Sequence, residues 1–220
     1  MQCIKDTIKN INIVIGCSIG CSYCYARMNN NRFHTIDDFN KLVFFENKLK
    51  MLDNKRYTAY LPTGQSDLSG WNEEWKDKVF SKMKENENTQ YIFLTKRPEN
   101  IKLKETPDNG WFGVTVTSSK EKTRIDYLRN NIKAKHYHIT FEPMFDDVGK
   151  LDLNNISWIV IGTETGNRKG KISSKREWVF NIYNQAKEKN IPVFMKEDLL
   201  EILNEDEFVQ EFPKEFGEIK

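Results

Sequence analysis

The chain of 220 residues has a formal net charge of +2, with 38% hydrophobic and 30% charged residues. This globular composition is long enough to bury a core, and its charge alone gives no argument for nucleic-acid or membrane binding, although it leaves room for a local basic patch. No apolar stretch approaches the roughly 18 residues of a membrane span, and no apolar signal core opens the chain. Because three of the four cysteines are clustered, we expect a cytoplasmic protein in a reducing compartment, without membrane contact.

Short β-rich runs alternate with amphipathic helical patterns along the sequence. In chain order they predict strand 11–16, helix 36–52, strand 57–61, helix 72–85, strand 90–94, a short helix after Pro98, a loop over 104–110, strand 111–116, helix 118–131, strand 136–141, an irregular segment over 142–156, strand 157–162, helix 174–190 and strand 191–196. Thr35 and Asn72 are the expected N-caps of the first two helices.

The alternation predicts an α/β fold, with parallel strands joined by right-handed crossovers and covered by outer helices. Two architectures fit the pattern: a doubly wound open sheet and an incomplete (β/α) barrel, since the chain is near the lower size limit for a full eight-fold barrel. We expect a single domain over residues 1–220, with its core over 10–198 and a C-terminal tail over 199–220.

Polar side chains, often beside Gly or Pro, follow every predicted strand directly. The segments in question are the cysteine-containing loop 17–24 and residues 62–67, 95–97, 115–119, 141–143, 162–166 and 195–198. In parallel α/β folds the C-terminal ends of the strands share one edge, and sites are built there. Loops are also polar for solvation alone, but solvation does not select glycine, acid and hydroxyl residues at strand ends.

Three cysteines with the spacing Cys17-x3-Cys21-x2-Cys24 follow the first predicted strand. Three thiols are one too few for a tetrahedral zinc site, unless a distant His34 or Cys3 completes it. A redox pair of the Cys-x2-Cys type would leave Cys17 without a role. A [4Fe–4S] cluster held by three thiolates leaves one iron without a protein ligand, and such an iron can coordinate a small molecule.

The arrangement of Cys17, Cys21, Tyr23 and Cys24 after a strand resembles the signature of the radical S-adenosylmethionine (SAM) superfamily. Further segments occur in the order seen in the phage Gp37/Gp68-like radical SAM proteins and, more narrowly, in the radical SAM mobile pair protein A type: residues 66–68, 93–100, 111–118, 141–145, 158–166 and 191–197. The sequence departs from that group at Thr117 and Ser118, where an acid is frequent. It also departs over residues 162–166, which read Gly-Thr-Glu-Thr-Gly where Gly-Gly-Glu-Ser-Gly is frequent.

The resemblance implies an incomplete (β/α) barrel of radical SAM type whose cofactors are one [4Fe–4S] cluster and SAM. It implies that the cluster is held by Cys17, Cys21 and Cys24, and that the open iron binds the amino and carboxylate groups of SAM. Reductive cleavage of SAM would then give a 5′-deoxyadenosyl radical that abstracts hydrogen from a substrate.

The resemblance also implies which residues contact SAM, although local structural roles compete with each assignment. Tyr23 is expected near the adenine. The glycine-containing stretch of Gly64, Gln65, Ser66 and Asp67 is expected at the methionyl amine, or else forms a helix-capping turn. Thr115, Thr117 and Ser118 are expected at the ribose or carboxylate, with a Ser118 N-cap as the alternative. Gly162 is expected under the adenine, or else serves a tight strand-end turn.

The predicted catalytic charges are Glu142, Glu164 and Lys96, with Arg97 and Lys196 beside them. They would bind substrate or the SAM carboxylate, or they would form a structural ion-pair network, because buried charges need partners. His136 and His138 share the alternation phase of Thr140 and Glu142, and they would face the interior or pack against a helix.

The partners expected from the resemblance are a flavodoxin- or ferredoxin-like reductant and a second radical SAM protein. A nucleic-acid base or nucleotide is the first substrate candidate, followed by a peptide or small molecule. The alternative function is that of an iron–sulfur and SAM-binding partner subunit, which supports a second radical SAM protein and does no chemistry alone.

Overall fold

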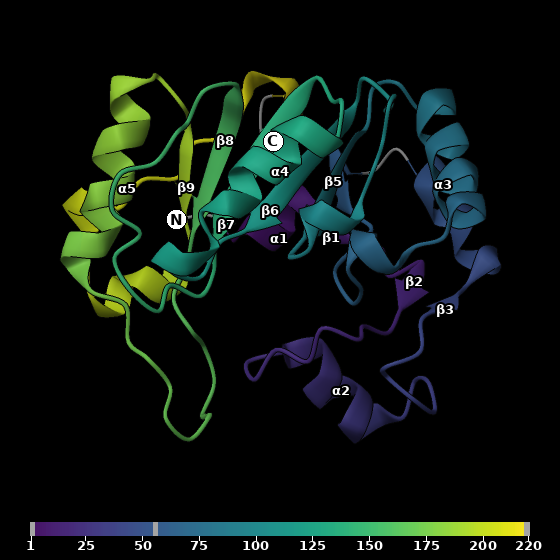
Figure 1. The fold of residues 1–220 in the computed structure, drawn as a ribbon, viewed down its shortest axis with the longest axis horizontal. Coiled ribbons are helices and arrows are strands. Elements are labelled where there is room, and N and C mark those ends of the chain that lie inside the picture. The colour runs from purple at the N-terminus through teal and green to yellow at the C-terminus, as the bar shows by residue number, and fades with distance from the viewer. Residues whose placement is uncertain (1–2, 55–56, 218–220) are drawn as a thin grey trace.

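The structure is a computed structural model that describes residues 3–54 and 57–217. Seven parallel strands form a sheet that curls into a half-barrel (Figure 1). Their order across the sheet is β1 (Ile8–Asn10), β4 (Ala59–Leu61), β5 (Gln90–Thr95), β6 (Gly110–Thr115), β7 (His136–Phe141), β8 (Ile156–Ile161) and β9 (Val193–Met195). This order follows the chain without reversal, whereas a doubly wound sheet reverses at a switch point. The predicted α/β half-barrel is therefore confirmed, and the doubly wound alternative is excluded.

The three long helices lie on one face of the sheet: α3 (Glu73–Glu85), α4 (Thr123–Asn131) and α5 (Arg176–Glu188) (Figure 1). Each buries apolar residues three or four positions apart, as Val79 and Met83 do in α3. The predicted Asn72 cap of α3 is confirmed, because its side-chain oxygen accepts a hydrogen bond from the Trp75 amide at 2.9 Å. All three helices cover the sheet because successive right-handed crossovers return to the same face.

The other face of the sheet is covered by the two ends of the described chain. Trp111 and Trp158, both fully buried, pack against Phe216, with ring centroids 5.0 and 5.3 Å away. Helix α1 (Ile4–Thr7) contributes Ile4 to the same cluster. The C-terminal segment also bonds to the edge strand, since the Met195 amide donates to the Val209 carbonyl at 2.8 Å. The predicted tail is thus packed against the core as far as residue 217.

The first predicted strand differs from the structure. The sheet begins with β1, three residues earlier than expected, and β2 (Val14–Ile15) instead pairs antiparallel with β3 (Val43–Phe44) in a separate two-stranded sheet. The apolar residues of the run over 11–16 are buried, but hydrophobicity does not specify the strand partner. The cysteine loop therefore follows the small accessory sheet of β2 and β3, which lies beside the end of β4.

The helix predicted over residues 36–52 is wrong, and no helix starts at Thr35. Ile36 and Phe39 pack against Ile15 and Ala26 under the cysteine loop, while Asp38 closes a turn by accepting the Asn40 amide at 2.9 Å. The chain then forms β3 and the 3-10 helix Glu46–Asp53. Instead, an α-helix occurs earlier, as α2 (Tyr25–Phe33).

The remaining elements agree with the expected ones within a few residues. The predicted helix 118–131 is divided into the 3-10 helix Ser119–Glu121 and α4. The other short 3-10 helices are Leu68–Gly70, Pro98–Asn100, Glu197–Glu201, Glu205–Glu207 and Lys214–Phe216. Within residues 3–54 and 57–217, no helix is long and apolar enough to cross a membrane.

Candidate functional site

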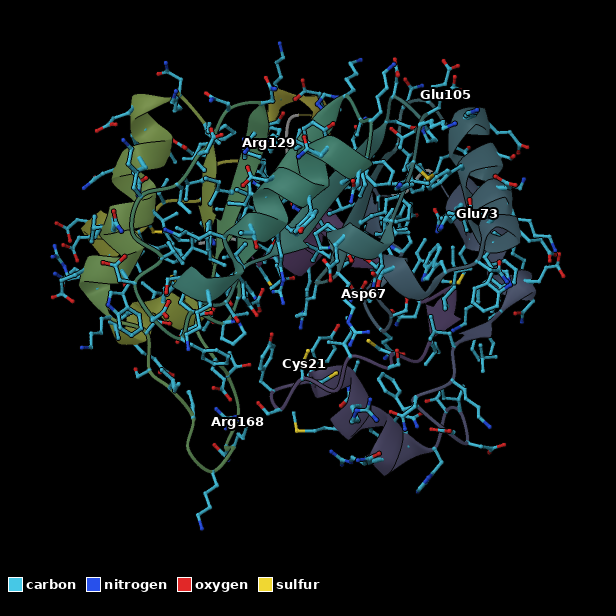
Figure 2. The ribbon with its side chains drawn as sticks, viewed as in Figure 1. Cys21, Asp67, Glu73, Glu105, Arg129 and Arg168 are labelled. Atoms are coloured by element: carbon cyan, nitrogen blue, oxygen red, sulfur yellow. The ribbon has the colours of Figure 1, made fainter. Side chains whose placement is uncertain are left out.

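The cysteine loop connects β2 to α2 and lies against the C-terminal edge of the sheet (Figure 2). Gly16 starts it with φ of +114°, and a Cβ there would stand 2.3 Å from the Lys41 carbonyl oxygen, so only glycine fits. The Gly16 amide donates to the Gln65 carbonyl at 3.1 Å, and the Cys17 amide donates to the Phe39 carbonyl at 2.7 Å. These bonds fix the loop beside the segment that follows β4.

The three cysteines of the loop are half-buried free thiols. Burial raises the pKa of Cys17, with nearby Asp67, Cys24 and Cys21 adding to the effect and a backbone hydrogen bond at Ile19 opposing it. The Cys24 sulfur accepts the Arg27 amide at 3.4 Å. Cys24 is therefore the N-cap of α2. The sulfurs of iron–sulfur clusters commonly accept hydrogen bonds of this kind.

The donor chemistry of the loop fits an iron–sulfur cluster, since three thiols on one loop are within electrostatic reach of one another. Their arrangement is not that of an assembled metal site: among the described residues, no three His, Cys, Asp or Glu side chains could hold a metal ion. The fit thus rests on donor type and loop position.

Tyr23 lies between the cysteine loop and the ends of β5 and β7. Its ring meets Phe145 edge-on at 5.3 Å between centroids, and the Lys96 Nζ lies 5.8 Å from the ring centroid. Burial raises the pKa of Tyr23, and the neighbouring Cys21 raises it further through charge and a hydrogen bond. The structure thus brings three predicted site residues together, Tyr23, Cys21 and Lys96.

In the stretch after β4, the Asp67 carboxylate forms its hydrogen bonds within the protein. Asp67 is buried, and its Oδ1 accepts hydrogen bonds from the Ser69 amide, the Ser69 hydroxyl and the Thr95 hydroxyl at 3.0, 2.7 and 2.7 Å. Its Oδ2 accepts the Lys96 amide at 2.7 Å. Asp67 therefore caps a short 3-10 helix and joins the ends of β4 and β5. This is the capping role that the sequence offered as the alternative to SAM binding.

Gly64, Gln65 and Ser66, which precede Asp67 in this stretch, lie beside the chain at the start of the cysteine loop. Ser66 bridges to Gly16 in parallel register, and its hydroxyl accepts the Trp71 indole N–H at 3.0 Å. Gly64 faces the side chains of Asn10 and Asn12, where a Cβ would come within 2.9 Å of the Asn12 Oδ1. That oxygen is buried and has no hydrogen-bond partner among the described residues. The Gln65 carbonyl accepts the hydrogen bond of the Gly16 amide.

The residues after β6 form a second internally bonded corner. Thr115 and Thr117 are buried, and the Glu121 carboxylate accepts both the amide and the hydroxyl of Thr117 at 2.7 and 2.8 Å. Arg124 donates to the Thr115 carbonyl at 2.7 Å and pairs with Glu121 at 2.8 Å. Ser118 occupies the N-cap position of the following 3-10 helix, but its side chain makes no capping hydrogen bond.

Glu142 and Lys196 form an ion pair across the ends of β7 and β9. Burial alone would lower the pKa of Lys196, but Glu142 and Asp198 outweigh it and raise that pKa, so the ammonium stays charged. Burial raises the pKa of Asp198, and Glu142 adds to the rise while Lys196 opposes it. Gly162 leaves room for the pair, because a Cβ there would stand 3.0 Å from Lys196 Cδ.

Glu164 is separate from that pair. Its carboxylate is buried, with 3% of the side chain exposed, and Arg168 binds it through two guanidinium nitrogens. The Arg168 hydrogen bonds lower the pKa of Glu164 despite its burial. The two residues anchor the loop that projects from the end of β8, where Figure 2 shows Arg168 on the same edge as Cys21.

The two histidines of β7 lie within the sheet and not at its C-terminal edge. His136 stacks on Trp111 with ring centroids 4.3 Å apart, and the His138 Nε2 lies 3.1 Å from the Phe93 carbonyl oxygen. His138 also packs under Gly113, where an added Cβ would come within 2.4 Å of the ring. Packing is therefore the role that the structure gives them.

Sequence reasoning missed two groups of the site. Tyr25 donates its hydroxyl hydrogen bond to the Gly64 carbonyl, and burial raises its pKa, as do Glu142 and Cys24. Asp198 accepts the Thr163 amide at 2.8 Å and faces Lys196. Asp198 belongs to the segment 195–198 that the sequence placed at the strand ends, but it was given no role of its own there, and Tyr25 makes contacts that no local pattern encodes.

The fold and the edge define the chain as an α/β half-barrel with a three-cysteine loop at the C-terminal ends of its strands. A family described as protein of unknown function (DUF5131) matches residues 2–201, and the chain belongs to this family. No curated protein and no solved structure matches the chain.

Proposed function

We propose that this chain is a radical SAM enzyme in which Cys17, Cys21 and Cys24 hold a [4Fe–4S] cluster. The observation that carries this proposal is the position of the three-thiol loop against the C-terminal edge of a curled parallel sheet, where such folds build their sites. When bound, the cluster offers an iron without a protein ligand to SAM, whose reductive cleavage supplies a 5′-deoxyadenosyl radical for hydrogen abstraction from substrate.

The residues around the loop have roles that follow from their contacts. Tyr23 and Lys96 form the wall next to Cys21 and offer an aromatic face and a cation to a bound nucleoside or carboxylate. Lys196 is held charged between Glu142 and Asp198, so this group presents fixed charges that orient a polar ligand. Asp67, Glu121 and Glu164 act indirectly, by holding the strand-end loops in place.

The proposed chemistry takes place in the cytoplasm and needs a one-electron donor of the flavodoxin or ferredoxin type. A nucleotide or nucleic-acid base is the proposed substrate class. The alternative, a SAM-binding partner subunit of a second radical SAM protein, shares the cluster residues and differs in doing no chemistry alone.

Anaerobic reconstitution with iron and sulfide tests the cluster. We expect about four iron atoms per wild-type chain and a brown protein that dithionite bleaches. Single Cys17→Ser, Cys21→Ser and Cys24→Ser variants should lose most of this iron, and Cys3→Ser should keep it as the matched control. A colourless protein that retains zinc would overturn the cluster.

The reaction is tested by adding SAM and dithionite to the reconstituted protein and measuring 5′-deoxyadenosine by chromatography. The proposal expects deoxyadenosine from the wild type and none from the three loop variants. SAM binding by equilibrium dialysis without deoxyadenosine, both alone and with substrate candidates, would favour the partner subunit instead.

A further inference from the structure

The C-terminal edge of the sheet carries cations that the protein itself does not neutralise. Lys96 and Arg97 follow β5, Lys120 follows β6, and Lys169 lies in the loop after β8. Within the described chain, none of these four forms an ion pair with a carboxylate. We call the four residues the basic edge. Lys96 and Arg97 are half-buried, so their charges have already lost part of their hydration, which favours an anionic ligand.

The acids of the same edge are engaged elsewhere. Asp67 accepts four hydrogen bonds, and Glu121 is shared by Thr117 and Arg124. Glu142 pairs with Lys196 and Glu164 with Arg168, while Asp146 accepts the amide and hydroxyl of Ser119. Exposed Glu99 is close to Arg97 in sequence but forms no ion pair with it. These carboxylates are thus held by groups of the protein itself, whereas the four cations of the basic edge have no carboxylate partner among the described residues and are available to an anionic ligand.

The members of the basic edge stand on loops that follow β5, β6 and β8. β5, β6, β7 and β8 are consecutive neighbours, and neighbouring strands are about 4.8 Å apart, so the strand ends from which these loops leave extend over roughly 14 Å. A single phosphate meets the loop of one strand only. A chain of phosphates meets the loops of all three strands.

Helix α2 lies on the same edge of the sheet (Figure 1) and carries exposed aromatic side chains. Tyr25 and Phe33 are 50% and 65% exposed, and the Arg32 guanidinium lies 5.1 Å from the Phe33 ring centroid. Helix α2 itself contains no acidic residue. Cations that follow a backbone beside aromatic faces on which bases stack are the features of single-strand nucleic-acid binding.

We infer that the C-terminal edge binds the phosphate backbone of a single-stranded nucleic acid through Lys96, Arg97, Lys120 and Lys169. Resting on the proposed function, the substrate of the radical reaction is then a nucleotide within a polymer. An unpaired strand suits that reaction, since enzymes that act on a base must take it out of the stack.

Fluorescence anisotropy with labelled DNA and RNA single strands of about 12 nucleotides, within the size range of such sites, tests the surface. If four phosphates are neutralised, affinity should fall about 50-fold between about 50 and 200 mM salt. The Lys120→Ala/Lys169→Ala double variant should halve the slope of log affinity against log salt. Lys84→Ala/Lys104→Ala removes two exposed cations near the opposite edge and should leave that slope unchanged.

Each further outcome supports or overturns the inference. Equal slopes for both double variants, or no binding at about 50 mM salt, overturn it. Equally tight binding of polyglutamate overturns the nucleic-acid identity in favour of an acidic protein surface, and preference for a duplex overturns the single strand. Binding without deoxyadenosine formation supports the surface and refutes the proposed chemistry, whereas deoxyadenosine without oligonucleotide binding refutes the surface alone.

Discussion

The Tyr25 hydroxyl donates a hydrogen bond to the Gly64 carbonyl oxygen, so the first residue of α2 is tied to the loop after β4. Tyr25 is adjacent in sequence to Cys24 and is close to the Glu142–Lys196 pair, whose charges act on its pKa. One side chain thus joins the cysteine loop to the loop after β4 and lies within electrostatic reach of the ends of β7 and β9.

Tyr25→Phe removes that bond and keeps the ring. We expect a loss of about 1 kcal/mol in the free energy of unfolding, the usual contribution of one hydrogen bond, and faster amide exchange in α2. Urea unfolding and hydrogen-exchange mass spectrometry measure both. Tyr127→Phe, on the exposed side of α4, is the matched control. Equal effects of the two substitutions would show that the tie has no stabilising role.

Asp67→Asn should destabilise the edge more strongly. The amide group cannot accept on its nitrogen, so either the Lys96 amide or the three Oδ1 donors lose their acceptor. A buried donor without a partner and the loss of charge-assisted bonds together cost about 2–3 kcal/mol. Thermal and urea unfolding measure the loss. Asp77→Asn, exposed on α3, should change stability by less than about 0.5 kcal/mol.

The buried His138 predicts a dependence of stability on pH. Burial lowers its pKa to about 4, and the hydrogen bond to the Phe93 carbonyl only partly opposes this. The folded chain keeps the ring neutral, whereas the unfolded chain binds a proton near pH 6.5. The contribution of His138 to the free energy of unfolding is therefore fully present above about pH 6.5. It falls by roughly 3 kcal/mol as the pH drops towards 4.

His138→Gln keeps a donor for Phe93 and removes the titration. In urea unfolding at several values between pH 4.5 and 7, its free energy of unfolding should depend less on pH than that of the wild type. Part of the slope remains, since burial also lowers the pKa of His136. A variant with the full wild-type slope would refute the assignment to His138.

The sequence predicted the sheet well where strands are buried on both sides. β5, β6, β7 and β8 are central strands, and their apolar runs are long enough to be recognised. β1 was missed because Lys9 and Asn10 are exposed on a three-residue edge strand. Its place in the sheet is set by pairing with β4, a contact that is distant in sequence.

The region around α2 was difficult for a related reason. Three consecutive asparagines, residues 29–31, have low helix propensity. The fold overrides this locally: Asn30 is buried and bonds both the amide and the carbonyl of Ile36, at 3.0 and 2.9 Å. The apolar spacing over 36–52 indicated a helix, but tertiary packing of Ile36 and Phe39 decided otherwise.

The sequence placed the candidate residues at one edge of the sheet but did not give the partners that they have there. Strand-end position brought Glu142 and Lys196 to one edge, and they are indeed paired. It did not reveal that Glu164 pairs with Arg168 four residues later, or that Glu121 supports Thr117. Both depend on loop conformations after the strands, where many paths are sterically allowed and hydrophobic periodicity gives no information.

The loop after β8 is predicted to depend on its buried ion pair. Arg168→Ala leaves the Glu164 carboxylate buried with the Ile172 amide at 3.3 Å as its remaining hydrogen-bond donor, a local cost of up to about 3 kcal/mol. Trypsin should then cleave this lysine-containing loop much faster than in the wild type. The lowered pKa of Glu164 means that its contribution is present above its ordinary pKa and is lost as the pH falls through the folded-state value.

A double variant separates the buried charge from the loss of arginine. Glu164→Gln/Arg168→Ala leaves a neutral amide and should recover much of the protection against trypsin that Arg168→Ala loses. Lys175→Ala, an exposed cation at the far end of the same loop, is the matched control and should be cleaved at Lys169 and Lys171 at the wild-type rate. If the double variant is as sensitive as Arg168→Ala, the arginine holds the loop through its bonds to the Lys169 and Gly170 carbonyls instead.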